Sequence, residues 1–175
     1  MKIKYKKIGI LGGTFDPPHK GHLNVAKIGI KKLKLDKLLW IITKENPLKK
    51  KPYLNIKKRI KLSKKITKGL KKISVNYLEK KIKNNNSFSL LKYIKKKYSK
   101  DEIYFLIGSD NLLKFHKWNN WKKIPKLAKM VIFPRDTYPV YLKSFIKRKK
   151  LDKDEWLYLN VKKINISSSL IRKFW

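Results

Sequence analysis

The sequence predicts an α/β protein built on a doubly wound parallel sheet. Short apolar runs of strand length alternate along the chain with longer segments whose apolar residues recur at helical spacing. Motifs rich in glycine, serine or charged residues directly follow several of the apolar runs. No internal repeat and no linker interrupts this alternation, so we expect residues 1–175 to form a single domain.

The first elements follow from two apolar runs and the segments around them. Residues 2–11 are expected to form a strand, because positions 8–11 are apolar without a break, as in a strand buried on both faces. Residues 23–33 follow as a helix with its apolar side chains on one stripe. Residues 38–42 form a second buried strand. The polar segment Thr43–Asn55 contains two prolines and is expected to be a mobile loop over a site.

The middle of the chain continues the alternation. Helical spacing of apolar residues predicts helices over 56–66 and 87–98, with a short strand at 73–75 and a polar connection at 79–86 between them. The apolar run at 103–108 is expected to be another central strand. The remaining expected elements are short helical turns at 112–121, a strand at 130–133, a helix at 138–150, a strand at 156–159 and a helix at 170–174 that begins after three serines.

The charge of the chain is extreme, with 48 Lys and Arg against 11 Asp and Glu and a net charge of +37. Clustered basic residues favour nucleic-acid binding, which is one interpretation. However, only four of these residues are arginines, and the lysines lie along every segment together with many Ile and Asn, as an AT-rich genome would produce. Base and phosphate recognition commonly uses the arginine fork. We therefore expect no nucleic-acid partner, but a surface that attracts small anionic substrates.

Several classes of protein are excluded by composition. The absence of cysteine excludes disulfides, a thiolate zinc site and a thiol nucleophile. No apolar run reaches the roughly 18 residues that a membrane span needs. No signal-peptide core follows Met1, so we expect a cytoplasmic protein. Neither a G-x-G-x-x-G fingerprint nor a P-loop is present, which argues against a dehydrogenase and a Walker-type kinase.

The most informative stretch runs from Gly12 to His22, between the first strand and the first helix. Its two glycines, Gly12 and Gly13, are expected to let the backbone turn and approach a ligand closely. His19 and His22 lie one helical turn apart at the start of a helix, where backbone N–H groups and the helix dipole favour an anion. This pattern indicates a phosphate under chemical attack; the alternative for either histidine is a hydrogen-bonded core residue.

Two motifs at opposite ends of the chain resemble one family. The stretch Gly-Gly-Thr-Phe-Asp-Pro-x-His-x-Gly-His at 12–22, together with Ile-Ser-Ser-Ser-Leu-Ile-Arg at 166–172, is similar to the nucleotidyltransferases with the H-x-G-H signature. This resemblance implies a Rossmann-like nucleotidyltransferase fold. It also implies a reaction that joins the α-phosphate of a nucleotide to an acceptor phosphate and releases pyrophosphate.

The middle of the chain resembles one group within this family. Residues 105–112, 115–118 and Trp121, with the segments 46–49 and 87–89, resemble the nicotinate-nucleotide adenylyltransferases, and the likeness extends from Lys7 to Lys173. It implies transfer of AMP from ATP to nicotinate mononucleotide, giving deamido-NAD and pyrophosphate in NAD biosynthesis. The alternatives are a related enzyme with nicotinamide mononucleotide or phosphopantetheine as the acceptor, and a basic nucleic-acid-binding protein.

The same resemblance assigns roles to individual residues. The implied catalytic residues are His19, His22, Lys49 and Arg172. The residues implied to bind ATP are Gly12, Gly13, Thr14, Phe15, His19, His22, Gly108, Asp110, Ser167, Ser168 and Arg172. The residues implied to bind the mononucleotide are Thr14, Lys49, Ser87 and Trp118. No protein side chain is expected to bind metal directly; Mg²⁺ would be held mainly by the ATP phosphates.

Some of these assignments have simpler alternatives. Asp110 could be a helix N-cap, and the serines at 167–169 could cap the last helix whether or not they bind phosphate. Trp121 is expected to pack in the core and His116 to be structural. The chain departs from the family at Leu90, where threonine is usual, and at 135–138, where Arg-Pro-Gly-Tyr is common. It also lacks the longer C-terminal helix of many relatives, so the oligomeric state is left open.

Overall fold

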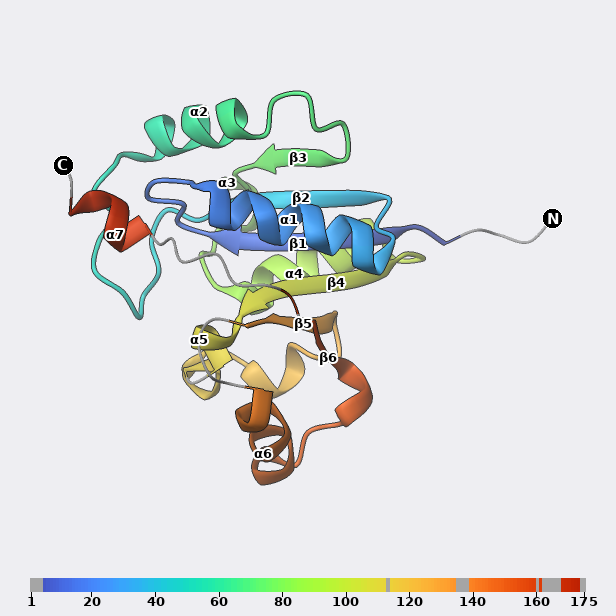
Figure 1. The fold of residues 1–175 in the computed structure, drawn as a ribbon. Helices are drawn as coiled ribbons and strands as arrows, with labels where there is room; N and C mark the ends of the chain where they lie inside the picture. Colours follow the sequence, from blue (N-terminus) through green and yellow to red (C-terminus); the bar gives the residue numbers. More distant parts are fainter. Residues whose placement is uncertain (1–4, 113, 135–138, 160, 162–167, 174–175) are drawn as a thin grey trace.

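The computed structural model describes residues 5–112, 114–134, 139–159, 161 and 168–173 of the chain. Its six strands form one sheet in the order β3-β2-β1-β4-β5-β6, and every neighbouring pair is parallel. The helices lie on both sides of this sheet (Figure 1). The prediction of a doubly wound parallel sheet is therefore confirmed.

The elements follow one another as strand and helix along most of the chain. The strands are β1 (Lys7–Gly13), β2 (Lys37–Ile42), β3 (Ile73–Asn76), β4 (Glu102–Gly108), β5 (Lys129–Phe133) and β6 (Trp156–Tyr158). The α-helices are α1 (Lys20–Leu33), α2 (Ile56–Ile66), α3 (Glu79–Ile82), α4 (Ser87–Lys97), α5 (Ser109–Leu112), α6 (Pro139–Lys149) and α7 (Ser168–Arg172). Short 3₁₀ turns are η1 (Phe115–Lys117), η2 (Trp121–Lys123) and η3 (Lys153–Glu155).

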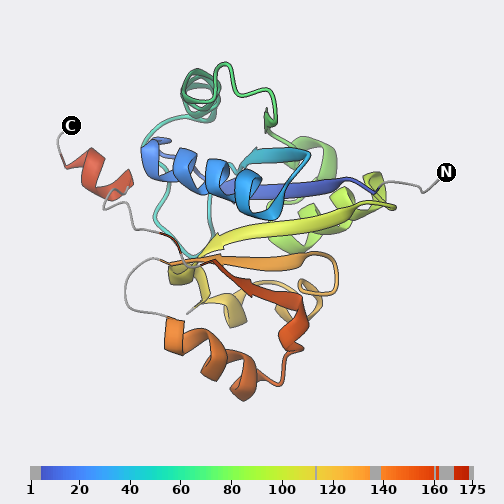
Figure 2. The ribbon, with the colours of Figure 1, turned by 45° about the vertical axis from the view of Figure 1, so that its right-hand side comes forward.

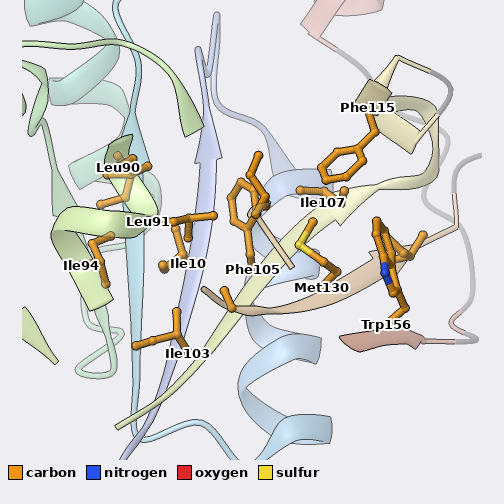
Figure 3. Close-up of a cluster of buried hydrophobic side chains, with 14 of the residues drawn as sticks. Ile10, Leu90, Leu91, Ile94, Ile103, Phe105, Ile107, Phe115, Met130 and Trp156 are labelled. Atoms are coloured by element: carbon orange, nitrogen blue, oxygen red, sulfur yellow. The ribbon is translucent and has the colours of Figure 1, made fainter. Parts of the chain in front are cut away.

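The central strands are buried on both faces, which explains their unbroken apolar runs. Successive side chains of a strand point to opposite faces of a sheet. In β1, Ile8 and Ile10 therefore join the core on the α4 side, whereas Leu11 joins the core on the α1 side. Figure 3 shows the first of these cores, where Leu91 of α4 lies beside Ile10 and Phe105 of the sheet.

Helices α1 and α4 cover opposite faces of the sheet (Figure 2). The strand order reverses its direction of growth between β1 and β4, which lie side by side. In open α/β sheets, ligands bind outside the carboxyl ends of the strands at such a switch point. The loop after β1 and helix α7 both lie at this edge (Figure 1). The topology thus brings together the two terminal motifs of the sequence.

Several element boundaries differ from the sequence-based expectation, including the end of β1 at Gly13 in place of Leu11 and the start of α7 at Ser168 in place of Leu170. Helix α1 begins at Lys20, three residues earlier than the expected start at Leu23, because His19 caps it. The polar connection expected at 79–86 contains the one-turn helix α3. Asp110 lies inside α5, which begins at Ser109, and so it is not a cap that precedes the helix.

Candidate active site

A cavity of about 1010 Å³ opens at the carboxyl ends of the central strands. Its walls come from the loop after β1, the start of α1, the segment after β2, the start of α4, the η1 region and α7. The predicted site residues that line it are Gly12, Gly13, Thr14, Phe15, His19, His22, Lys49, Ser87, Gly108, Trp118, Ser168 and Arg172. One hollow therefore collects residues that are up to 160 positions apart in the sequence (Gly12 to Arg172).

The expectation that two glycines form the turn is wrong. Gly12 and Gly13 belong to β1 and pair with Ile41 and Ile42 of β2. The left-handed backbone conformation lies instead at Phe15, with φ of 48°. Gly12 is exposed to the cavity, so its lack of a side chain leaves room there for a ligand.

The buried side chain of Phe15 packs the loop after β1 against the sheet. Its ring is buried and stacks on Trp40 of β2, with ring centroids 4.3 Å apart. The same ring meets His22 edge-on at 4.9 Å. A core contact of this kind offsets the cost of a non-glycine residue in the left-handed region. Because the ring is buried, Phe15 could contact a ligand only through its backbone.

The two histidines form a reciprocal cap at the start of α1. His19 Nδ1 accepts from the Gly21 N–H at 3.1 Å, and His22 Nδ1 accepts from the His19 N–H at 3.3 Å. The imidazole rings stack with centroids 3.7 Å apart. Because each Nδ1 accepts a hydrogen bond, the proton of each neutral ring resides on Nε2. Both rings are thereby fixed as Nε2–H donors beside a helix N-terminus.

Asp16 connects the loop between β1 and α1 (residues 14–19), here called the histidine loop, to two distant segments. The sequence had not singled out this residue. Its carboxylate accepts from the N–H groups of Tyr53 and Leu54 at 2.7 and 2.8 Å. Arg172 Nη1 donates to the Asp16 carbonyl and lies 3.5 Å from Oδ2 of the carboxylate. Asp16 is only 5% exposed. The side chain belongs to the quoted motif, but its partners depend on the tertiary fold.

Helix α7 reaches the same loop from the other end of the chain. Ser168 Oγ donates to the Pro17 carbonyl at 2.9 Å, and Arg172 Nη2 lies 3.2 Å from Ser169 Oγ. These contacts hold the predicted phosphate-binding arginine at the rim of the cavity. Ser167 and the family departure at 135–138 lie outside the described residues.

The opposite wall of the cavity is aromatic and amide-rich. Trp118 is half-buried against Phe105 and Phe115, with ring centroids 6.2 and 5.3 Å away. Ser87 begins α4, whose N-cap Asn86 accepts from the Ser89 N–H at 2.8 Å. These groups form a flat apolar surface beside several polar ones, as a base-binding pocket requires.

Three residues near these motifs do not line the cavity: Asp110, His116 and Trp121. Asp110 is half-buried on α5 but does not line the cavity, whereas its neighbour Asn111 does. Trp121 lies outside the cavity and packs on Phe115, with ring centroids 6.1 Å apart, as expected of a core residue. His116 is exposed and outside the cavity.

The charge of the lining favours anions. The basic side chains that line it are Lys49, Lys50, Lys51, Lys114, Lys117 and Arg172, against the acidic Asp16, Glu45 and Glu79. Burial raises the pKa of Glu79, while the hydrogen bond from the Lys44 N–H works in the opposite direction. Among the described residues, no three His, Asp or Glu side chains are grouped as metal ligands.

Comparison with known proteins agrees with this geometry. The cytidylyltransferase-like family model matches residues 10–174. Two relatives are named "probable nicotinate-nucleotide adenylyltransferase". The one from Pelagibacter ubique (strain HTCC1062) is 44% identical over 173 residues, covering 99% of this chain and 96% of the relative. The one from Endomicrobium trichonymphae is 34% identical over 168 residues, covering 95% of this chain and 84% of the relative.

A solved structure shares the fold. Nicotinic acid mononucleotide adenylyltransferase of Plasmodium falciparum, in complex with APC, superposes with a TM-score of 0.79. The match covers 97% of this chain and 84% of the other at 24% sequence identity. Within the described residues, no helix has both the length and the apolar character that crossing a bilayer would require.

Proposed function

Because the chain belongs to the cytidylyltransferase-like family, and within it to the nicotinate-nucleotide adenylyltransferases, we infer that it adenylylates nicotinate mononucleotide. The adenylyl group comes from ATP, and the products are deamido-NAD and pyrophosphate. This is a step of NAD biosynthesis. The observation that carries the proposal is the pair of stacked imidazoles, fixed as donors in a cationic cavity beside a helix N-terminus.

The reaction makes one bond and breaks one. An oxygen of the mononucleotide 5′-phosphate attacks the α-phosphorus of ATP, and the bond between that phosphorus and the oxygen bridging to the β-phosphate breaks. Pyrophosphate leaves with the electron pair. Such transfers depend on in-line positioning and on charge neutralisation, with little covalent work by the protein.

The histidines supply this neutralisation at the α-phosphate. Their Nε2–H groups would donate to its oxygens as negative charge builds up on the leaving group. Both rings are held by backbone hydrogen bonds before substrate arrives. A preorganised donor of this kind is worth about 10²–10³ in rate.

The β- and γ-phosphates of ATP would lie between α7 and the three consecutive lysines at 49–51. Arg172 can present its planar fork to the β- and γ-phosphates, which matches their geometry better than an ammonium group does. Ser168 adds a hydroxyl at the same place, and Lys49 lines the same cavity. The role of Asp110 at the ribose stays a prediction, since its side chain is outside the cavity lining.

The mononucleotide would occupy the wall formed by Trp118 and the start of α4. The indole offers a face on which a pyridine ring can stack. The Ser87 hydroxyl and the neighbouring backbone N–H groups would donate hydrogen bonds to the nicotinate carboxylate. Mg²⁺ bound to the ATP phosphates would screen their charge, and no cluster of protein carboxylates competes for it among the described residues.

An acceptor panel tests the proposal. Purified protein with ATP and Mg²⁺ should release pyrophosphate with nicotinate mononucleotide, and much more slowly with nicotinamide mononucleotide or phosphopantetheine. A faster rate with another acceptor would reassign the substrate. The absence of pyrophosphate with all three would refute the proposed activity.

A further inference from the structure

Arg59 is a buried cation that no step of the proposed reaction uses. It lies in the first turn of α2 and is only 2% exposed. Its guanidinium donates four hydrogen bonds, all to backbone carbonyls. The acceptors are Leu54 from Nε at 2.9 Å, Thr14 and Thr43 from Nη1 at 2.7 Å each, and Lys44 from Nη2 at 2.7 Å.

These four carbonyls belong to three separate segments at the active site. Thr14 lies in the histidine loop, directly after β1. Thr43 and Lys44 begin the connection from β2 to α2, and Leu54 lies near its end. These two ends are the stems of the segment 45–52, here called the lysine loop, in which every residue lines the cavity. Arg59 thus joins both stems of the lysine loop to the histidine loop.

Two carboxylates complete the attachment of the stems. Glu79 accepts from the Lys44 N–H at 2.8 Å, and Asp16 accepts from the N–H groups of Tyr53 and Leu54. Burial lowers the pKa of Arg59, and the charges of Asp16 and Glu79 oppose that effect. Each stem is therefore held by the guanidinium on its carbonyl side and by a carboxylate on its amide side.

Only an arginine can make this set of contacts. Its planar fork directs five N–H donors along fixed lines, whereas lysine carries three donors on one atom at the end of a flexible stem. A lysine at position 59 would keep the positive charge but could not reach four carbonyls on three segments. The substitution Arg59→Lys therefore removes the hydrogen-bond geometry while it keeps the positive charge.

We propose that Arg59 is a positioning residue for the transfer reaction. It fixes the stems of the lysine loop relative to the histidine loop, so that Lys49 and the two imidazoles meet the same phosphate chain. A misplacement of about 1 Å far from the chemistry can reduce a rate about 10²-fold. This inference rests on the proposed function for its kinetic part, and on the hydrogen-bond geometry for its structural part.

The test compares Arg59→Lys with Arg148→Lys, a matched change at an exposed arginine of α6. At a temperature where both variants are folded, kcat at saturating substrates should fall about 10- to 100-fold for Arg59→Lys and stay unchanged for Arg148→Lys. Amide hydrogen exchange of residues 43–55 should accelerate in Arg59→Lys while β1 and β4 stay protected. A residue that only stabilises the fold would leave kcat of the folded protein intact, and that result would overturn the proposal.

A second measurement needs neither activity nor a folded variant at position 59. The chain has only four arginines, so their side-chain NMR signals can be assigned from lysine variants of the other three. In the free wild-type protein, the Nη groups of Arg59 should give separate, slowly exchanging proton signals that persist when ATP is added. Averaged, fast-exchanging signals would overturn the attachment of the two loops by Arg59. If the wild type releases no pyrophosphate while the slow signals persist, the proposed function fails and this attachment stands.

Discussion

At the scale of single residues, the histidine pair has a structural role in addition to the chemical role proposed for it. His19 and His22 cap the first turn of α1 with their Nδ1 atoms, so the cap does not use their Nε2–H groups. The cap also fixes both rings against rotation, because each is hydrogen-bonded to the backbone that carries the other. A structural role for these histidines is therefore compatible with their proposed role in catalysis.

Replacing His22 by alanine should reduce kcat about 10²- to 10³-fold, because one preorganised donor to the α-phosphate is lost. The melting temperature should change little in comparison, since His22 is only half-buried and the rest of α1 is retained. Steady-state kinetics with thermal melts of the same preparation measures both. A variant that melts normally and turns over at the wild-type rate would remove His22 from the mechanism.

Replacing Trp118 by alanine should raise the KM for nicotinate mononucleotide more than the KM for ATP, because the stacking surface for the pyridine ring is lost. Trp121→Ala is the matched control, since Trp121 packs on the same Phe115 ring but lies outside the cavity. The opposite pattern, with the ATP KM more affected, would place the mononucleotide elsewhere in the cavity.

Glu79 should give the protein a measurable pH dependence of stability. Burial raises the pKa of Glu79 above its ordinary value of 4.5, so the native state holds this proton more tightly than the unfolded chain does. The stabilisation that protonation gives is complete below pH 4.5 and is lost as the pH rises through the raised pKa. In Glu79→Gln the side chain stays neutral at every pH.

The free energy of unfolding of the wild type, minus that of Glu79→Gln, should therefore decrease as the pH rises from about 4 to 6. Urea denaturation of both proteins across this range measures the difference and cancels the contribution of other groups. A difference that is constant or that increases with pH would contradict the raised pKa.

The residue scale is also where sequence reasoning was least complete. The motif residues could be predicted because their types and spacing are characteristic of phosphate chemistry, and the structure gathers most of them around one cavity. The partners of Asp16 could not be predicted, since they lie on residues 53 and 54 of another loop. Arg59 did carry a signal, as one of four arginines in a lysine-rich chain. Its hydrogen-bond acceptors lie outside its own helix, so its role could not be inferred from its place in a predicted helix.

At the scale of elements, the buried strands were predictable and the short helices were not. Strands β2, β4 and β5 are apolar at nearly every position, because both of their faces pack against helices. The four-residue helices α3 and α5 have too few residues for an apolar stripe, so no periodic pattern indicates them.

Helix α1 packs on the sheet through Gly29, where a Cβ would lie 2.5 Å from Cδ2 of the buried Leu106. Gly29→Val should therefore destabilise the fold by about 1–3 kcal/mol through overpacking. Lys27→Val is the control, since it introduces the same β-branched residue on the exposed face of the same helix and should cost only about 0.5 kcal/mol. Helix propensity alone would favour Gly29→Val, since glycine is a poorer helix former than valine. A loss in urea denaturation no larger than that of Lys27→Val would therefore contradict the close contact.

At the scale of the whole molecule, the sheet order and the net charge act together. The order β3-β2-β1-β4-β5-β6 places the site at the reversal between β1 and β4. The alternating elements predicted a doubly wound parallel sheet, but not this order. The charge of +37 surrounds this site with a positive field. That field attracts ATP and the mononucleotide but also makes the folded chain repel itself.

Salt should therefore change stability and substrate binding in opposite directions. Between about 0.02 and 0.3 M NaCl, the melting temperature should rise because self-repulsion is screened, while the KM for ATP should also rise because its attraction is screened. Thermal melts and initial rates over the same salt series measure both. A melting temperature that falls with salt would show that attractive ion pairs outweigh the repulsion.

The central claim is that this cavity carries out attack at the α-phosphorus of ATP by nicotinate mononucleotide. The most direct test follows the fate of labelled ATP, with Mg²⁺ and the mononucleotide present. Label at the α-phosphate should appear in deamido-NAD, and label at the γ-phosphate should appear only in pyrophosphate. His22→Ala should slow both transfers equally. Appearance of the γ-label in the acceptor, or an α-label that never reaches the dinucleotide, would contradict the account.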